Sequence, residues 1–239
     1  MTWIWLLLIV FVAYLVQSIT GFGGVLLSLP LVILLVGFDD ARLLTTALSL
    51  VTGLIVSSTH YRQINKKKLG LILLVMAVGT AFGMILDRLL DARFLILLYG
   101  VVTVLLAIFR LLPKRQESRS PTPFFLFGIL LLAGIMQGLF VAGGAFLMIY
   151  AIYEFPDKTE FRATSSAVWG ILNIFMMIVY GYSGRINTGN LKLVAICIPV
   201  VLAMIFLAEK IQARIKQAVF AKLTNVLLLA SGLILLVSY

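Results

Sequence analysis

Charged residues are scarce in this chain. Of its 239 residues, only 12% are Asp, Glu, Lys or Arg, whereas 62% are hydrophobic. A soluble domain carries about 25% charged residues. The acidic residues lie in or beside short polar breaks between apolar runs, and no alternating pattern indicates β-strands. Because a backbone in lipid must satisfy its own hydrogen bonds, the sequence predicts an all-α polytopic membrane protein.

Several catalytic signatures are also absent. The chain has no HExxH motif and no Walker A motif, and no apolar segment carries His, Asp or Glu at its centre. This argues against an intramembrane metalloprotease, a carboxylate proton relay and nucleotide hydrolysis by the chain itself. The single cysteine, Cys197, lies in an apolar run, where an inert buried thiol is expected. We expect no catalytic residue, no metal site and no cofactor.

Ten apolar segments are present, five on each side of a polar linker. They are 3–20, 24–37, 43–59, 69–86 and 94–112, then 124–142, 144–153, 163–183, 191–207 and 218–237. Most are long enough to cross a hydrocarbon core of about 30 Å. As helices, 24–37 and 144–153 would extend only about 21 and 15 Å. We expect these two to be half-helices, and the sequence leaves open whether 3–37 and 124–153 are re-entrant hairpins or full spans.

The basic residues orient the chain and account for its formal net charge of +10 without nucleic acid as a partner. If loop 60–68 is cytoplasmic, 14 Lys and Arg residues lie inside and 5 lie outside, as the positive-inside rule requires. The inside set is Arg62, Lys66, Lys67, Lys68, Arg110, Lys114, Arg115, Arg119, Lys158, Arg162, Lys210, Arg214, Lys216 and Lys222. The outside set is Arg42, Arg88, Arg93, Arg185 and Lys192. This predicts a multi-pass protein of the inner membrane with both termini in the periplasm.

One pattern occurs twice, 120 residues apart. Residues 17–24 read QSITGFGG, and residues 137–144 read QGLFVAGG. The same spacing relates Arg42 to Arg162, and a slightly longer spacing relates Asp87 to Glu209. Because matching segments then have opposite orientations, we expect two inverted-topology repeats of about five helical segments, each with a glycine-broken short helix. The N-terminal membrane repeat would be 1–112, the cytoplasmic linker 113–122 and the C-terminal membrane repeat 123–239.

The glycine breaks are the candidate substrate site. A helix that begins inside a membrane presents free N–H groups and a positive dipole end, which suit an anion. Glutamine amides, hydroxyls and arginines near the breaks add hydrogen-bond donors. The predicted set is Gln17, Gly21, Gly23, Gly24, Arg42, Thr45 and Thr46 in the first half, and Gln137, Gly143, Gly144, Arg162, Ser165, Ser166 and Asn173 in the second.

Each of these features also has a purely structural interpretation. Small residues allow helices to pack closely in membranes, and an asparagine such as Asn173 can form an interhelical hydrogen bond. The two arginines can extend to the membrane interface or pair with Asp39, Asp40 or Glu160. His60 adjoins the basic loop, where a solvated interface residue is expected. The sequence leaves these alternatives open.

The chain resembles the sulfite exporter TauE/SafE family of bacterial and archaeal membrane proteins. The resemblance rests on the motif at 17–24 with Leu29-Pro30-Leu31, on RLLTTALSL at 42–50, and on QGLFVAGGAFL and FRATSSAVWGILN at 137–147 and 161–173. It implies a secondary transporter that exports small sulfur-containing anions such as sulfite or organosulfonates. One departure is that Val141-Ala142 replaces Gly21-Phe22. The partners would be a small anion and the lipid bilayer, and a homo-oligomer is left open.

Other functions are compatible with the same segments. An anion channel would differ from a transporter by single-channel current in place of saturable flux. A membrane-embedded enzyme acting on lipid would turn over in detergent without a gradient, and a structural assembly subunit would bind no anion.

The predicted orientation can be tested by reporter fusion. A reporter placed after Tyr239 is expected to be active only in the periplasm. A cysteine in place of Lys67 is expected to react only with a thiol reagent supplied from the cytoplasm, because the basic loop stays inside. The opposite pattern would overturn the orientation.

Overall fold

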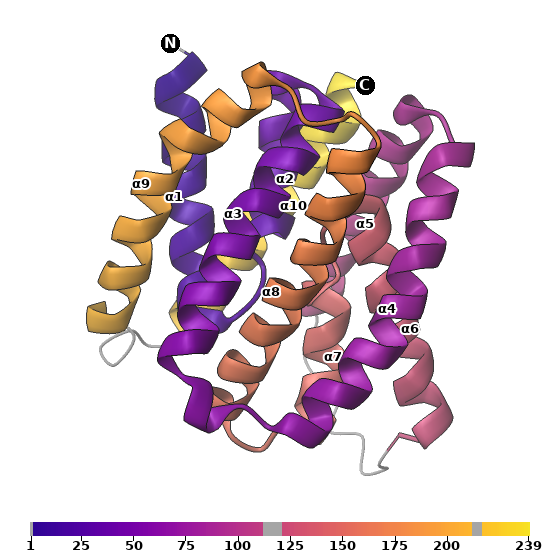
Figure 1. Cartoon of the computed structure of the whole chain (residues 1–239), viewed down its shortest axis with the longest axis vertical. Coiled ribbons are helices and arrows are strands. Elements are labelled where there is room, and N and C mark those ends of the chain that lie inside the picture. The colour runs from indigo at the N-terminus through magenta and orange to yellow at the C-terminus, as the bar shows by residue number, and fades with distance from the viewer. Residues whose placement is uncertain (1, 112–120, 212–216) are drawn as a thin grey trace.

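The computed structural model describes residues 2–111, 121–211 and 217–239. In these ranges the chain forms helices and no strand (Figure 1). The α-helices are α1 Thr2–Thr20, α2 Gly24–Val36, α3 Phe38–Thr59, α4 Lys66–Leu89, α5 Ala92–Leu111, α6 Pro123–Phe140, α7 Gly144–Glu154, α8 Lys158–Tyr182, α9 Thr188–Ile211 and α10 Gln217–Ser238. A short 3₁₀ helix, η1, covers Tyr61–Gln63. The predicted all-α fold is confirmed; most of linker 113–122 lies outside the described residues.

Six of the described helices are long and apolar enough to cross a membrane: α1, α3, α4, α6, α8 and α9. Large apolar side chains also cover the outside of the bundle, for example Leu74, Phe82 and Phe206, which are 69%, 51% and 71% exposed. In water such a surface would be unfavourable, whereas lipid accommodates it. The protein is therefore a multi-pass membrane protein.

The helices that follow the glycine breaks are short, as expected. Helix α2 has 13 residues and α7 has 11, so they extend only about 20 and 16 Å. Helix α2 packs against α1, and α7 packs against α6. Each break therefore joins a long helix to a short one that lies beside it, which is the arrangement that a re-entrant pair requires.

The two halves contact each other through matched helix pairs. Helix α3 packs on α8, and α5 packs on α10. Helix α4 packs on α6, while α9 packs on α1. At the repeat spacing of about 120 residues, α6 is the counterpart of α1, and α9 is the counterpart of α4. The contact of α4 with α6 and the contact of α9 with α1 are therefore equivalent: in each, the fourth helix of one half packs on the first helix of the other half. The inverted repeat stays a prediction, and these exchanged pairings are contacts that it requires.

Both ends of the chain lie at the same end of the bundle (Figure 1). The first half begins there with α1, and the second half begins at the opposite end with α6. This arrangement fits two halves that run in opposite directions. Which end faces the periplasm stays a prediction.

Glycines bring the halves into backbone contact. A Cβ on Gly134 of α6 would lie 2.9 Å from the Cα atoms of Gly79 and Met76 on α4, and would overlap the Met76 carbonyl oxygen. On the central pair, a Cβ on Gly53 of α3 would lie 2.7 Å from the backbone nitrogen of Gly170 on α8. Such contacts are typical of membrane helices, which associate through close packing of small residues.

We therefore expect Gly134→Ala to destabilise the protein. The added methyl group meets backbone atoms that cannot rotate away, and overpacking costs about 1–3 kcal/mol. The matched control is Gly128→Ala in the same helix, because a Cβ there meets nothing within 4 Å and helix propensity favours alanine by up to about 1 kcal/mol. Thermal unfolding in detergent should separate the two variants, and equal melting temperatures would contradict the close crossing.

Candidate functional site

The first helix break, at Gly21-Phe22-Gly23, depends on left-handed backbone at both glycines. Their φ angles are +81° and +88°, a region that glycine enters without strain. The carbonyl oxygen of Gly21 accepts hydrogen bonds from Trp169 Nε1 at 2.8 Å and from Ser165 Oγ at 3.1 Å. Both donors belong to α8, so the second half of the chain holds the first break in place.

The second break, at Val141-Ala142-Gly143, is held from within its own half. Gln137 Oε1 accepts a hydrogen bond from Gly143 N at 3.3 Å, and Gln137 Nε2 donates to Asn173 Oδ1 at 2.8 Å. Val141 has a φ of +58°, although a β-branched residue is strained there. Val141 corresponds to Gly21 at the 120-residue spacing, so the replacement noted in the sequence preserves the left-handed backbone.

The two breaks lie against each other. A Cβ on Gly144 would be 3.1 Å from Phe22 Cβ and 3.5 Å from the backbone nitrogen of Gly23. Glycine at position 144 therefore allows the start of α7 to approach the turn that precedes α2. This contact places both breaks at one location between the two halves.

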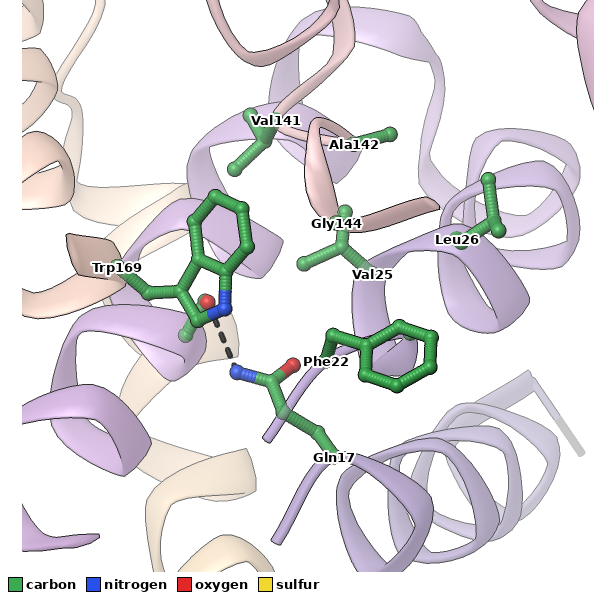
Figure 2. A pocket seen from close by; sticks show the side chains of 10 residues that line it. Gln17, Phe22, Val25, Leu26, Val141, Ala142, Gly144 and Trp169 are labelled. Atoms are coloured by element: carbon green, nitrogen blue, oxygen red, sulfur yellow. Dashed lines mark hydrogen bonds between the residues drawn. The ribbon is translucent and has the colours of Figure 1, made fainter. Parts of the chain in front are cut away.

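A pocket opens where the breaks meet (Figure 2). Its lining residues are Gln17, Phe22, Gly23, Val25, Leu26, Ser49, Val141, Ala142, Gly144 and Trp169. The space open to the centre of a water molecule is about 10 Å³, which is about what one water needs. In this conformation the pocket is too narrow for a sulfur oxyanion.

Figure 2 shows Gln17 and the Trp169 indole ring on one side of this space, with Val141 and Ala142 beyond the ring. Gln17 is buried, and its Nε2 donates to Ser49 Oγ at 2.9 Å. At the start of α2, Leu27 N donates a hydrogen bond to Gly23 O. The N–H groups that precede Leu27 in the first turn therefore have no partner within the helix.

The described lining residues thus include amide and hydroxyl groups, a helix N-terminus and no carboxylate. A pocket with these groups attracts an anion more than a cation, because the positive end of the α2 dipole points toward it. Of the predicted site residues, Gln17, Gly23 and Gly144 line this pocket.

The other predicted site residues lie in its walls or farther away. Gly21 and Gly24 form the break itself, and Gln137, Gly143 and Asn173 form the hydrogen-bonded support of the second break. The hydroxyls of Thr45 and Thr46 donate to carbonyls of their own helix, Ala41 O at 2.8 Å and Arg42 O at 2.7 Å. Ser166 is buried and is not among the lining residues.

Arg42 lies at one end of the central helix pair in a network of charges. Its side chain is buried, and Nη1 donates to Asp87 Oδ1 at 2.5 Å while Nη2 donates to Gly138 O at 3.2 Å. Arg185 donates to the other oxygen of Asp87 at 2.9 Å. The guanidinium of Arg42 also lies 5.0 Å from the Phe38 ring, a favourable cation–π distance.

Arg162 forms the corresponding network at the other end. It is buried, and its Nε donates to Ser18 O at 2.7 Å while Nη2 donates to Glu209 Oε1 at 2.8 Å. His60 Nε2 lies 3.5 Å from Arg162 Nη1 and 3.8 Å from Glu209 Oε2. His60 is therefore only partly exposed and takes part in this network, unlike the solvated residue expected from the sequence.

Asp87 and Glu209 are acidic partners of Arg42 and Arg162, and neither acid was among the partners considered from the sequence. The repeat contained the signal, since Asp87 and Glu209 are matched positions of the two halves. Ser49 and Trp169 were missed for another reason: each becomes part of the site only when α3 and α8 pack beside the breaks.

Comparison with known proteins agrees with this architecture. A pocket between two broken helices of a multi-pass helical protein is an arrangement typical of membrane transport proteins. The sulfite exporter TauE/SafE family matches residues 6–235, and the chain belongs to this family. It is also 24% identical over 193 residues to the probable inner membrane transporter protein TsaS of Comamonas testosteroni, a match that covers 80% of each chain. No solved structure matches the chain significantly.

The first break provides a direct test of this geometry. Gly21→Ala is expected to destabilise the fold, because a Cβ there would lie 2.6 Å from Ser165 Oγ and 2.9 Å from Arg162 Cα. Overpacking adds about 1–3 kcal/mol to a left-handed strain of about 1–2 kcal/mol. Gly184→Ala is the control, since its φ is +67° and nothing lies within 4 Å. A melting temperature no lower for Gly21→Ala than for Gly184→Ala would refute the cross-half contact.

Proposed function

We propose that the protein is a secondary transporter that exports small sulfur-containing anions, such as sulfite or organosulfonates, across the inner membrane. The observation that carries the proposal is the pocket at the junction of the two helix breaks. Its polar groups are Gln17, Ser49 and the N-terminus of α2, and no carboxylate is among its described lining residues. Family membership adds the class of substrate.

The proposed direction agrees with the membrane potential. The bacterial interior is negative, and each charge that crosses about 100 mV gains or loses roughly 2.3 kcal/mol. An anion that leaves the cell moves down this potential, so export needs no carboxylate at the membrane centre. The pocket would have to widen during transport, because its present space holds about one water molecule.

Each of the two arginines already forms an ion pair with a carboxylate in this structure. An anion that bound Arg42 or Arg162 would compete with Asp87 or Glu209. The pocket, in contrast, offers donors without a competing carboxylate. We therefore propose that the pocket is the binding site of the anion. The two arginines would lie along the path by which the anion enters or leaves the pocket. We propose no catalytic role, because the matching family is described as a sulfite exporter family.

Flux into liposomes tests the function. The purified protein in liposomes is expected to catalyse saturable sulfite flux that an inside-negative potential drives outward, with less flux of chloride. Single-channel currents would instead identify an anion channel, and lipid turnover without a gradient would identify an enzyme. Absence of any flux of sulfite or of small sulfonates would refute the proposed substrate class.

Gln17 should contribute directly to binding. We expect Gln17→Met to weaken sulfite binding roughly ten- to a hundredfold, because a hydrogen bond to a charged group is worth about 1.5–3 kcal/mol. Gln137→Met is the matched control: it removes the corresponding amide, which supports the second break outside the pocket lining. Calorimetry of sulfite binding to both variants measures the difference, and equal losses of affinity would exclude Gln17 as a pocket donor.

A further inference from the structure

The two charge networks connect the halves of the chain at opposite ends of the central helix pair. At one end, Asp87 of the first half binds Arg185 of the second, and Arg42 binds the carbonyl oxygen of Gly138. At the other end, Arg162 of the second half binds the carbonyl oxygen of Ser18 and lies beside His60 of the first. Each network is thus a polar connection between the halves.

The contacts of the two arginines are reciprocal. Arg42 donates to the carbonyl of residue 138, and Arg162 donates to the carbonyl of residue 18. Donors and acceptors are both separated by the repeat spacing of 120 residues. Each arginine also pairs with the acid near the end of the fourth helix of its own half, Asp87 on α4 and Glu209 on α9. The same connection is therefore made twice.

The pocket lies between these two connections. Along α3, the lining residue Ser49 follows Arg42 and precedes His60, about 10 Å from the first and 16 Å from the second at 1.5 Å per residue. On α8, Trp169 follows Arg162 by the same interval that separates Ser49 from Arg42. An anion leaving the pocket toward either end of the pair approaches one of the networks.

We infer that the Arg42–Asp87–Arg185 network and the Arg162–Glu209–His60 network are the two gates of the transporter, and that they open one at a time. This rests on the proposed transport function. The Arg42–Asp87 pair is buried, and Arg162 is buried although the side chain of its partner Glu209 is 38% exposed. Such pairs suit a gate, because paired charges are stable where water is excluded and separated charges are stable only once water reaches them. Each network thus has two distinct arrangements, as a gate requires. The ion pairs of both networks are formed in this structure.

Charge selection follows from the same arrangement. When Asp87 or Glu209 moves away with its helix, the guanidinium that it neutralised faces the opened route. An anion is then attracted to the entrance, and a cation is repelled. The arginines would therefore act on the anion at the entrances and not in the pocket.

Cysteine accessibility tests the gates without any substrate. Ser49→Cys places a thiol in the pocket, in a background where Cys197→Ala removes the buried native thiol. A membrane-impermeant maleimide is supplied to right-side-out and inside-out vesicles. Asp87→Asn is expected to raise labelling about tenfold from one face, and Glu209→Gln from the opposite face, a shift of about 1.4 kcal/mol in each equilibrium.

Milder variants cover the case in which Asp87 or Glu209 is needed for folding. Arg185→Gln and His60→Gln each remove a contact between the halves and leave the Arg42–Asp87 and Arg162–Glu209 pairs in place. They should show the same sidedness with smaller increases. The controls are Asp91→Asn, whose exposed carboxylate accepts a hydrogen bond from Phe94 N, and Glu154→Gln, which belongs to neither proposed gate; neither should change the sidedness.

The outcomes separate this inference from the proposed function. Increased labelling from opposite faces in the Asp87→Asn and Glu209→Gln variants supports the gates. This holds even if the wild-type protein in liposomes transports no sulfite; only the proposed substrate would then be refuted. Unchanged labelling, or equal increases from both faces in both variants, overturns the gates even where sulfite flux is normal.

Discussion

A helix that ends inside a membrane leaves backbone groups that water cannot reach, and the structure of this protein is organised around satisfying them. The carbonyl of Gly21 receives two donors from α8, and Gly143 N finds the side chain of Gln137. The hydrogen bonds to Gly21 join the two halves, whereas the hydrogen bond from Gly143 N to Gln137 lies within the second half. The pocket is what remains where the two broken helices meet.

Buried charge imposes a second constraint of the same kind. An arginine inside a membrane protein is costly unless it is paired and hydrogen-bonded. Arg42 and Arg162 each satisfy this with one carboxylate of their own half and one backbone carbonyl of the other. The same hydrogen bonds that make these charges tolerable also hold the halves together. Stability and gating therefore depend on the same atoms.

The sequence predicted the fold well because membrane helices follow the local hydrophobic pattern. The ten α-helices of the described residues occur where apolar segments were found, and both short helices follow the glycine breaks. The starts were less accurate: α3 begins at Phe38 and α8 at Lys158, about five residues before the apolar runs at 43 and 163. Polar residues at these ends suggested loops, but local contacts favour helix there: Asp157 caps α8 by accepting from Thr159 N, and Asp39 and Asp40 lie in the first turn of α3, where acids are favourable.

The site was predicted only in part, for a related reason. Gln17, Gly23 and Gly144 belong to a local motif that repeats, so they could be found from one sequence. Ser49 and Trp169 have no such motif, and their role comes from helix packing across more than 30 and 140 residues. The partners of the arginines were visible as matched acids, but sequence spacing alone did not show which acid each arginine would bind.

The bond between Arg162 and Ser18 has a consequence for biosynthesis. It joins residues 144 positions apart, and the bonds from α8 to Gly21 span comparable distances. Chains are made from the N-terminus, so α1 and α2 enter the membrane well before α8 exists. During that interval the break at Gly21 lacks the donors that later hold it. The carbonyl oxygen of Gly21 therefore receives its two hydrogen bonds from α8 only after α8 has been synthesised and inserted.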